Sequence, residues 1–207
     1  MSLALADVFV HPSAIVEDGV HIGGGTRIWD GVHVRHSTEI GEECIVGEKS
    51  YIAYGVRIGN RVKINAFVYI PTGVTIEDGA MISAGTVFTN DRFPRATTPD
   101  LRELRSSEPD EETLETRVRE GATIGAHSTI GCGIEIGRFA MVGMGSVVTK
   151  SIPDFHLALG SPARSAGVVC RCGRPTLRFT GDAMPERLTC GACNRHYTLR
   201  DGSVSEA

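Results

Sequence analysis

The chain has 207 residues, 21 basic and 25 acidic, and a formal net charge of −4. This balance provides no basic face for nucleic acid, and no apolar run approaches the roughly 20 residues that cross a bilayer. The first ten residues are apolar but carry Asp7 and lack a basic segment, which argues against a secretion signal. We therefore expect a soluble, cytoplasmic protein of one domain plus a small appendage, with no nucleic-acid or membrane partner.

An aliphatic residue recurs at every sixth position through the first half of the chain. Neither the helical period of 3.6 nor the strand period of 2 produces such a pattern over this length. The residue four places after each aliphatic one is small or β-branched up to Thr86, and the same period resumes at Val118. The first series consists of Val10, Val16, Ile22, Ile28, Val34, Ile40, Val46, Ile52, Ile58, Ile64, Ile70, Ile76, Ile82 and Phe88.

A period of six predicts short strands separated by corners, with three hexads in each triangular coil. Positions one and five of a hexad then point inward, where β-branched side chains pack well. Successive coils pair as parallel strands ~4.8 Å apart, so about six or seven coils form a prism on the order of 30 Å long. The expected fold is all-β, a parallel β-helix whose repeats bury their core only by stacking.

A long insertion over residues 94–117 interrupts this repeat. It contains three prolines, seven acidic and four basic residues, so it has too few apolar side chains to form a core. One interpretation is a solvent loop, and the other is a binding loop that reaches a neighbouring prism. We favour the second, because long loops in compact folds are usually functional or disordered.

The insertion leaves the fifth coil just after Asn90. If the coils stack in register, the residues equivalent to Asn90 in other coils form one column on the surface: His36, Tyr54, Thr72, Cys132 and Lys150. Several of these side chains can form hydrogen bonds outward. The alternative is that they only serve the turns at a corner of the prism.

The segment VTIEDGAMISAGTVFTNDRFPRA, residues 74–96, carries a family resemblance. The hexads over about 10–164 resemble those of hexapeptide-repeat proteins, which implies a left-handed β-helix. Most such proteins are trimeric acyltransferases with active sites between neighbouring prisms. The FTND string with its Pro-Arg pair resembles bacterial N-acetyltransferases for nucleotide-linked 3-amino sugars, including UDP-2-acetamido-3-amino-2,3-dideoxy-glucuronate and dTDP-3-amino-3,6-dideoxyhexoses.

This resemblance implies that Asn90 lies beside the sugar amine. Its carbonyl oxygen would orient the nucleophile, while backbone N–H groups polarise the thioester carbonyl. His127, at a corner of the sixth coil, is a candidate base, and its alternative role is that of an exposed turn residue. The residues expected to bind the substrate are Tyr54, Thr72, Asp91, Arg92 and Arg95. A carbonic anhydrase would need a histidine pair about five residues apart in the later coils, and no such pair occurs in the sequence.

The segment Val142–Arg164 is expected to bind acetyl-CoA, the co-substrate. Gly143 and Gly145 allow close approach of the CoA arm, and Lys150 and Arg164 can meet its phosphates. The string GSPAR, which contains Pro162, resembles the Gly-x-Pro-Ala ending of many hexapeptide acetyltransferases. The same residues also suit closure of the prism, and both roles are compatible.

The tail, residues 165–207, follows the β-helix domain of residues 1–164 and contains four cysteines. Cys170, Cys172, Cys190 and Cys193 resemble a zinc ribbon, two thiol-bearing turns each set in a β-hairpin. The first pair is C-x-C rather than C-x-x-C, and His196 is an alternative ligand. Four protein ligands leave no open position, so a zinc ion here would be structural.

Together these features predict a homotrimeric, acetyl-CoA-dependent N-acetyltransferase. Its acceptor would be the 3-amino group of a nucleotide-linked sugar, of the UDP-3-amino-glucuronate type, in surface polysaccharide synthesis. Two alternatives stay open: an O- or N-acetyltransferase for another small molecule, and a non-catalytic trimeric β-helix that only binds a ligand.

Overall fold

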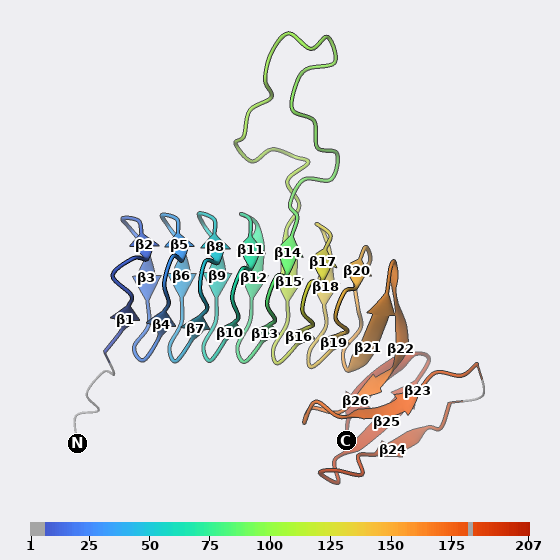
Figure 1. Cartoon of the computed structure of the whole chain (residues 1–207). Helices are drawn as coiled ribbons and strands as arrows, with labels where there is room; N and C mark the ends of the chain where they lie inside the picture. Colours follow the sequence, from blue (N-terminus) through green and yellow to red (C-terminus); the bar gives the residue numbers. More distant parts are fainter. Residues whose placement is uncertain (1–6, 182–183) are drawn as a thin grey trace.

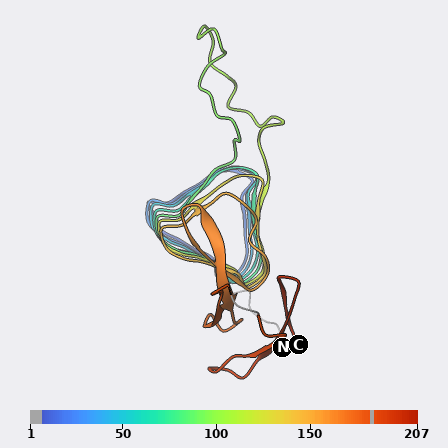
Figure 2. The ribbon, with the colours of Figure 1, turned by 90° about the vertical axis from the view of Figure 1, so that its right-hand side faces the viewer.

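The computed structural model describes residues 7–181 and 184–207, and every regular element in these ranges is a β-strand. Short strands stack into a triangular prism with an arm projecting from one corner and a hairpin unit at the C-terminal end (Figure 1). Viewed along its axis, the prism encloses one continuous core (Figure 2). Within the described ranges, no helix is long or apolar enough to cross a membrane.

Three sheets form the faces of the prism, here called faces A, B and C; their strands pair in parallel except at the C-terminal end of face A. Face A comprises β1 (Phe9–Val10), β4 (Arg27–Ile28), β7 (Ile45–Val46), β10 (Lys63–Ile64), β13 (Met81–Ile82), β16 (Thr123–Ile124), β19 (Met141–Val142), β21 (His156–Gly160), β22 (Ala163–Val169) and β23 (Pro175–Arg178). Face B comprises β2 (Ile15–Val16), β5 (His33–Val34), β8 (Tyr51–Ile52), β11 (Tyr69–Ile70), β14 (Val87–Phe88), β17 (Thr129–Ile130) and β20 (Val147–Val148).

Face C comprises β3 (His21–Ile22), β6 (Glu39–Ile40), β9 (Arg57–Ile58), β12 (Val74–Ile76), β15 (Thr116–Val118) and β18 (Glu135–Ile136). The predicted parallel β-helix is therefore confirmed, including the fifth coil, in which β15 completes the triangle begun by β13 and β14. The predicted insertion ends two residues inside β15, because Thr116 and Arg117 already pair with Val74 and Thr75.

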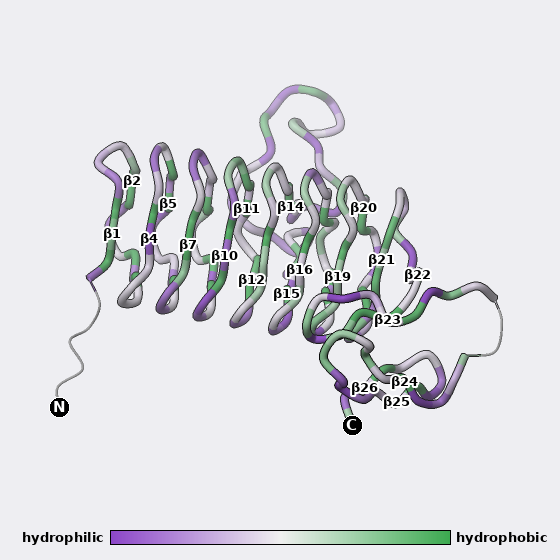
Figure 3. Tube along the Cα trace, turned by 60° about the horizontal axis from the view of Figure 1, so that its bottom comes forward, coloured by the Kyte–Doolittle hydropathy of each residue, from purple (hydrophilic) through white to green (hydrophobic). Residues whose placement is uncertain are grey.

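From Ile28 onward the core contains the aliphatic series that the period of six predicts, whereas Val10 is 40% exposed and Val16 and Ile22 are only partly buried. Ile28, Val34 and Ile64 are fully buried, and hydrophobic and hydrophilic segments alternate along each coil (Figure 3). The position four residues later holds small side chains that link adjacent coils. Thr26 is one example: its hydroxyl donates to the carbonyl of Gly41 at 2.8 Å and accepts from the backbone N–H of Cys44 at 2.9 Å. Buried hydroxyls at this position, Thr38 and Ser50 among them, thus pair with backbone carbonyls of the next coil.

The insertion forms an arm, residues 89–115, with a narrow neck. Asp91 and Thr113 form an antiparallel bridge, and the backbone N–H of Leu114 donates to the carbonyl of Asn90 at 2.8 Å. The arm then extends away from the prism (Figure 2). Its leucines Leu101 and Leu104 are about four-fifths exposed, at 79% and 82%. The arm has no core of its own, as its composition predicts.

The C-terminal unit continues from face A. Strands β21, β22 and β23 pair antiparallel, and the predicted domain boundary at residues 164/165 falls inside β22. A separate sheet of β24 (Arg187–Thr189), β25 (His196–Arg200) and β26 (Ser203–Glu206) follows. Phe155 of the prism packs against Tyr197 in a second hydrophobic cluster, so the unit covers the end of the β-helix.

Candidate functional site

The predicted column of surface residues lies along the edge between faces B and C. Pairing of Tyr69 with Val87, and of Val87 with Thr129, sets the register of adjacent coils. The residues three places beyond these pairs, including Thr72 and Asn90, therefore stack along one edge, as predicted. At its start the rings of His36 and Tyr54 lie parallel, with centroids 5.3 Å apart.

Asn90 stands at the base of the arm. It follows β14 by two residues, is half-buried, and has its backbone carbonyl held by the returning chain at Leu114. A short strand of a rigid prism therefore sets its position on one side, and the neck of the arm sets it on the other. Such double support is what a residue needs to hold a reacting group in place.

The other predicted substrate residues of the arm have different local roles. The carboxylate of Asp91 accepts the backbone N–H of Phe93 at 2.9 Å, so Asp91 shapes the turn into the arm. The Arg92 guanidinium lies over the Phe93 ring, 5.3 Å from its centroid. Arg95 and Arg105 line a cleft of about 410 Å³ further along the arm. Of these, the arginine-lined cleft is suited to an anionic group.

Tyr54 shows that the arm lies near the column. The pKa of the Tyr54 hydroxyl is raised, first by burial and then by the negative charge of Glu108, a residue of the arm. The returning half of the arm therefore lies within electrostatic range of the edge that carries Asn90 and Thr72.

His127 lies on a different edge, between faces A and B. It adopts a left-handed backbone conformation, with φ of 55°, and its exposed ring covers Gly85 of the preceding coil. Asn90 follows β14, whereas His127 precedes the neighbouring strand β17, so the two lie at opposite ends of face B. The separation along a strand of this length is on the order of 15 Å. A single chain does not bring them together.

The predicted CoA residues occupy the last coils. Lys150 is exposed on the same edge as Asn90, two coils further along, which corresponds to roughly 10 Å. Gly145 is open, because a Cβ there would meet nothing within 4 Å. The space beside Gly143 is filled, since a Cβ there would lie 2.3 Å from the Leu159 side chain. Gly143 therefore serves the packing of the end of the prism.

Pro162 and Arg164 lie at the end of face A. Pro162 is in the turn between β21 and β22, and the Arg164 guanidinium donates to the carbonyl of Ala163 at 2.8 Å. Both side chains are exposed. Arg164 is thus available to an anionic ligand, while nothing in this turn distinguishes Pro162 from a residue that only closes the prism.

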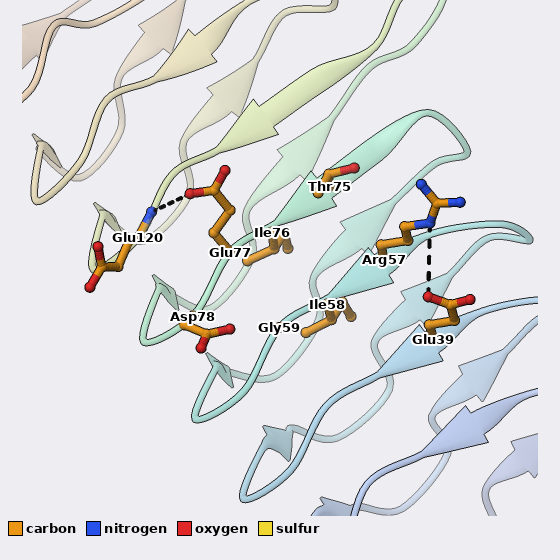
Figure 4. A pocket seen from close by; sticks show the side chains of 9 residues that line it. All are labelled: Glu39, Arg57, Ile58, Gly59, Thr75, Ile76, Glu77, Asp78 and Glu120. Atoms are coloured by element: carbon orange, nitrogen blue, oxygen red, sulfur yellow. Dashed lines mark hydrogen bonds and ion pairs between the residues drawn. The ribbon is translucent and has the colours of Figure 1, made fainter.

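A groove that the sequence did not reveal runs along face C, with a volume of about 520 Å³ (Figure 4). Each carboxylate of its lining pairs with an arginine: Glu39 with Arg57, Glu77 with Arg119, Asp78 with Arg61 and Glu120 with Arg138. The groove lies on face C, which borders the edge that carries the column.

Face B carries an aromatic ladder that the sequence analysis also missed. The rings of Tyr51 and Tyr69 stack with centroids 5.4 Å apart, and His33 meets Tyr51 edge-on. Val87 continues this row and is 40% exposed. The signal was present in the sequence, because these residues all precede an inward-pointing hexad residue and so point outward.

The fold defines a β-helix protein of hexad coils with one long insertion at a corner. Two protein families match parts of the chain. The family "Bacterial transferase hexapeptide (six repeats)" matches residues 19–54 and 55–90, and the family "Hexapeptide repeat of succinyl-transferase" matches residues 38–71 and 116–150. The chain therefore carries hexapeptide repeats over residues 19–90 and 116–150.

Two named proteins are similar to this chain over part of their length. The chain is 47% identical over 91 residues to the dTDP-3-amino-3,6-dideoxy-alpha-D-galactopyranose 3-N-acetyltransferase of Aneurinibacillus thermoaerophilus, which covers 44% of each protein. It is 28% identical over 169 residues to the bifunctional protein GlmU of Carboxydothermus hydrogenoformans, covering 74% of this chain and 38% of GlmU. The matches thus span less than half the length of these two relatives.

A solved structure shares the fold. A variant of AntD, an N-acyltransferase from Bacillus cereus crystallised with dTDP and coenzyme A, superposes with a TM-score of 0.55. The two chains are 23% identical, and the match covers 80% of this chain and 83% of AntD. At this identity the likeness extends to the β-helix fold alone.

Proposed function

We propose that the protein transfers acetyl from acetyl-CoA to the 3-amino group of a nucleotide-linked sugar. The observation that carries this proposal is the 47% identity to a sugar 3-N-acetyltransferase. The position of Asn90 supports it, because an amide side chain at a rigid edge beside a long arm can orient an amine. We further propose that the enzyme acts in the cytoplasm, in the synthesis of surface polysaccharide.

The active site would form between two copies of the chain. Asn90 and His127 lie at opposite ends of face B, so one copy cannot bring both to a single amine. We propose a trimer in which the Asn90 edge of one copy faces the His127 edge of the next. On face B, Tyr69 is 45% and Val87 40% exposed, which supplies an apolar surface of the kind that subunit contacts bury.

The reaction needs an unprotonated amine, a polarised thioester and a route for one proton. The Asn90 side-chain carbonyl accepts an N–H of the sugar amine and aims its lone pair at the acetyl carbon. The new C–N bond forms as the C–S bond breaks, and the amine proton passes to His127 of a neighbouring copy or to the departing thiolate. Lys150 and Arg164 would neutralise the CoA phosphates.

We propose a UDP-3-amino-glucuronate type of sugar as the acceptor. The cleft on the arm carries Arg95 and Arg105, which suit a carboxylate or a diphosphate. Arg105 is partly neutralised by Asp110 at 3.2 Å, which leaves Arg95 as the stronger candidate. The relative from Aneurinibacillus is named for a dTDP-linked sugar, so dTDP-3-amino sugars are the competing acceptors.

The test measures release of free CoA thiol by the purified full-length chain. We expect turnover with a UDP- or dTDP-linked 3-amino sugar and none with serine, simple sugars or amino antibiotics. Asn90→Ala should reduce kcat/KM by about 10²-fold, the usual effect of removing one positioned polar group. Cys132→Ser, one coil away on the same edge, is the matched control and should retain activity. Lack of turnover with every amino sugar would contradict the proposal.

A further inference from the structure

The four cysteines of the tail meet at one point between two hairpins. All four Sγ atoms lie within 4.8 Å of one another. Cys170 and Cys193 approach to 3.4 Å, and Cys172 and Cys190 to 3.7 Å. A tetrahedral zinc ion with Zn–S bonds of ~2.3 Å places its sulfur atoms about 3.8 Å apart. The cluster already has the size of such a tetrahedron.

Two similar turns bring the thiols together. In the first turn, the backbone N–H of Cys170 donates to the carbonyl of Arg174, and the carbonyl of Cys170 accepts from the N–H of Gly173. In the second turn, the backbone N–H of Cys190 donates to the carbonyl of Arg195, and the carbonyl of Cys190 accepts from the N–H of Asn194. Gly173 and Asn194 both have positive φ, 85° and 58°. Each turn therefore closes through its own backbone. The short C-x-C spacing does not prevent Cys170 and Cys172 from facing the second pair.

A buried tyrosine supports the cluster from behind. The Tyr197 hydroxyl accepts the backbone N–H of Arg171 at 2.9 Å and lies 3.0 Å from Cys170 Sγ. Because that N–H occupies one side of the phenol oxygen, the hydroxyl proton is free to point at the sulfur. Cys172 N–H also approaches Cys170 Sγ, at 3.4 Å. Hydrogen bonds of this kind stabilise a metal-bound thiolate and orient it.

We propose that Cys170, Cys172, Cys190 and Cys193 bind one zinc ion that joins the two hairpins and fixes the tail against the end of the prism. Four thiolates fill the coordination sphere, so the ion is structural. His196 is not needed as a ligand, since it is exposed and its Nδ1 pairs with the Thr189 hydroxyl at 3.0 Å.

The contacts around the cluster connect the proposed metal site to the end of the prism. Beside Cys170, the Arg171 guanidinium lies over the Phe139 ring at 4.5 Å. Phe139 stacks on Phe155, and Phe155 meets Tyr197 edge-on. These rings cover the last coil, whose edge would otherwise be open. Terminal caps of this kind are a requirement of stacked-repeat proteins.

The test measures zinc in the full-length chain purified with a reductant, by inductively coupled plasma mass spectrometry. We expect one zinc per chain, and the same in Cys132→Ser, whose cysteine lies outside the cluster. Cys172→Ser should lose most of the metal. Tyr197→Phe should keep the four ligands but bind zinc about 10–100-fold more weakly in competition with a chelator. Co²⁺ added to the metal-stripped wild-type chain should give the absorption of a tetrahedral tetrathiolate site, which does not depend on any variant folding.

Two results would overturn the proposal. One is a wild-type chain that contains no zinc and gives no tetrahedral Co²⁺ spectrum under reducing conditions. The other is Cys170–Cys193 or Cys172–Cys190 disulfides in protein purified without reductant, with no metal bound. Because the readout is metal content and cobalt absorption, the test is independent of acetyl transfer.

Discussion

A methyl group added at Gly85 should displace His127 without removing it. A Cβ at Gly85 would lie 2.6 Å from His127 Nδ1, closer than real contacts allow, so the ring must rotate. Gly79 is the matched control: its φ of 67° is close to the 70° of Gly85, but a Cβ there meets nothing within 4 Å. The two alanine variants therefore share their backbone strain and differ in the contact with His127.

The expected losses of stability follow from the backbone strain and from the contact with His127. A left-handed conformation costs an L-residue about 1–2 kcal/mol, of which about 0.4–1 kcal/mol is offset by the stiffer unfolded chain. Gly79→Ala should thus lower the free energy of unfolding by about 1 kcal/mol. Gly85→Ala adds the cost of pushing the histidine off its rotamer, about 0.5–1.5 kcal/mol. In a His127→Ala background this addition should vanish.

Urea unfolding at one fixed protein concentration gives these free energies, and the four variants of the cycle give the coupling. If Gly85→Ala and Gly79→Ala are equally destabilising, and the coupling with His127 is zero, the ring does not lie over Gly85 and the reasoning is refuted. The same variants inform catalysis. Should His127 be the base, Gly85→Ala must slow acetyl transfer while Gly79→Ala leaves it unchanged.

Three further predictions concern the core, the arm and pH. Ile124→Ala, at a fully buried hexad position, should lower the free energy of unfolding by about 2–5 kcal/mol in urea titrations. Joining Asp91 to Thr113 by a two-residue turn, which removes the arm beyond its neck bridge, should leave the circular dichroism spectrum unchanged and abolish acetyl transfer; retained activity would contradict a binding role for the arm. Burial lowers the pKa of His156 below its ordinary value of 6.5. Its neutral form favours the fold, so stability should be complete above pH 6.5 and fall as the pH decreases below it, more steeply than in His156→Gln.

The period of six was sufficient to predict the β-helix. Each hexad buries its first and fifth side chains, so the choice of Val, Ile and small residues at those positions reports directly on the core. Ile82 and Val118 illustrate this, because their phase alone placed β13 and β15 on different faces of the fifth coil. The column through Thr72 and Asn90 was predictable for the same reason: identical coils stack in register.

The sequence predicted the candidate site only in part. The string around Asn90 marked the corner, but Asp91 proved to shape a turn and Gly143 to make room for Leu159. Neither result was accessible beforehand, since both depend on contacts that no local pattern encodes. The groove on face C was missed because its residues come from several coils.

By itself, the sequence determined which residues point inward, where the repeat breaks and which residue types stand at the break. These are properties of spacing, and spacing is a local quantity. Only the tertiary structure decided which corners meet. It placed Asn90 and His127 on different edges of one prism, and it brought Cys170 and Cys193 to 3.4 Å across two hairpins. The physical reason is that proximity across coils depends on how elements stack and on where two turns are aimed, which no single segment specifies.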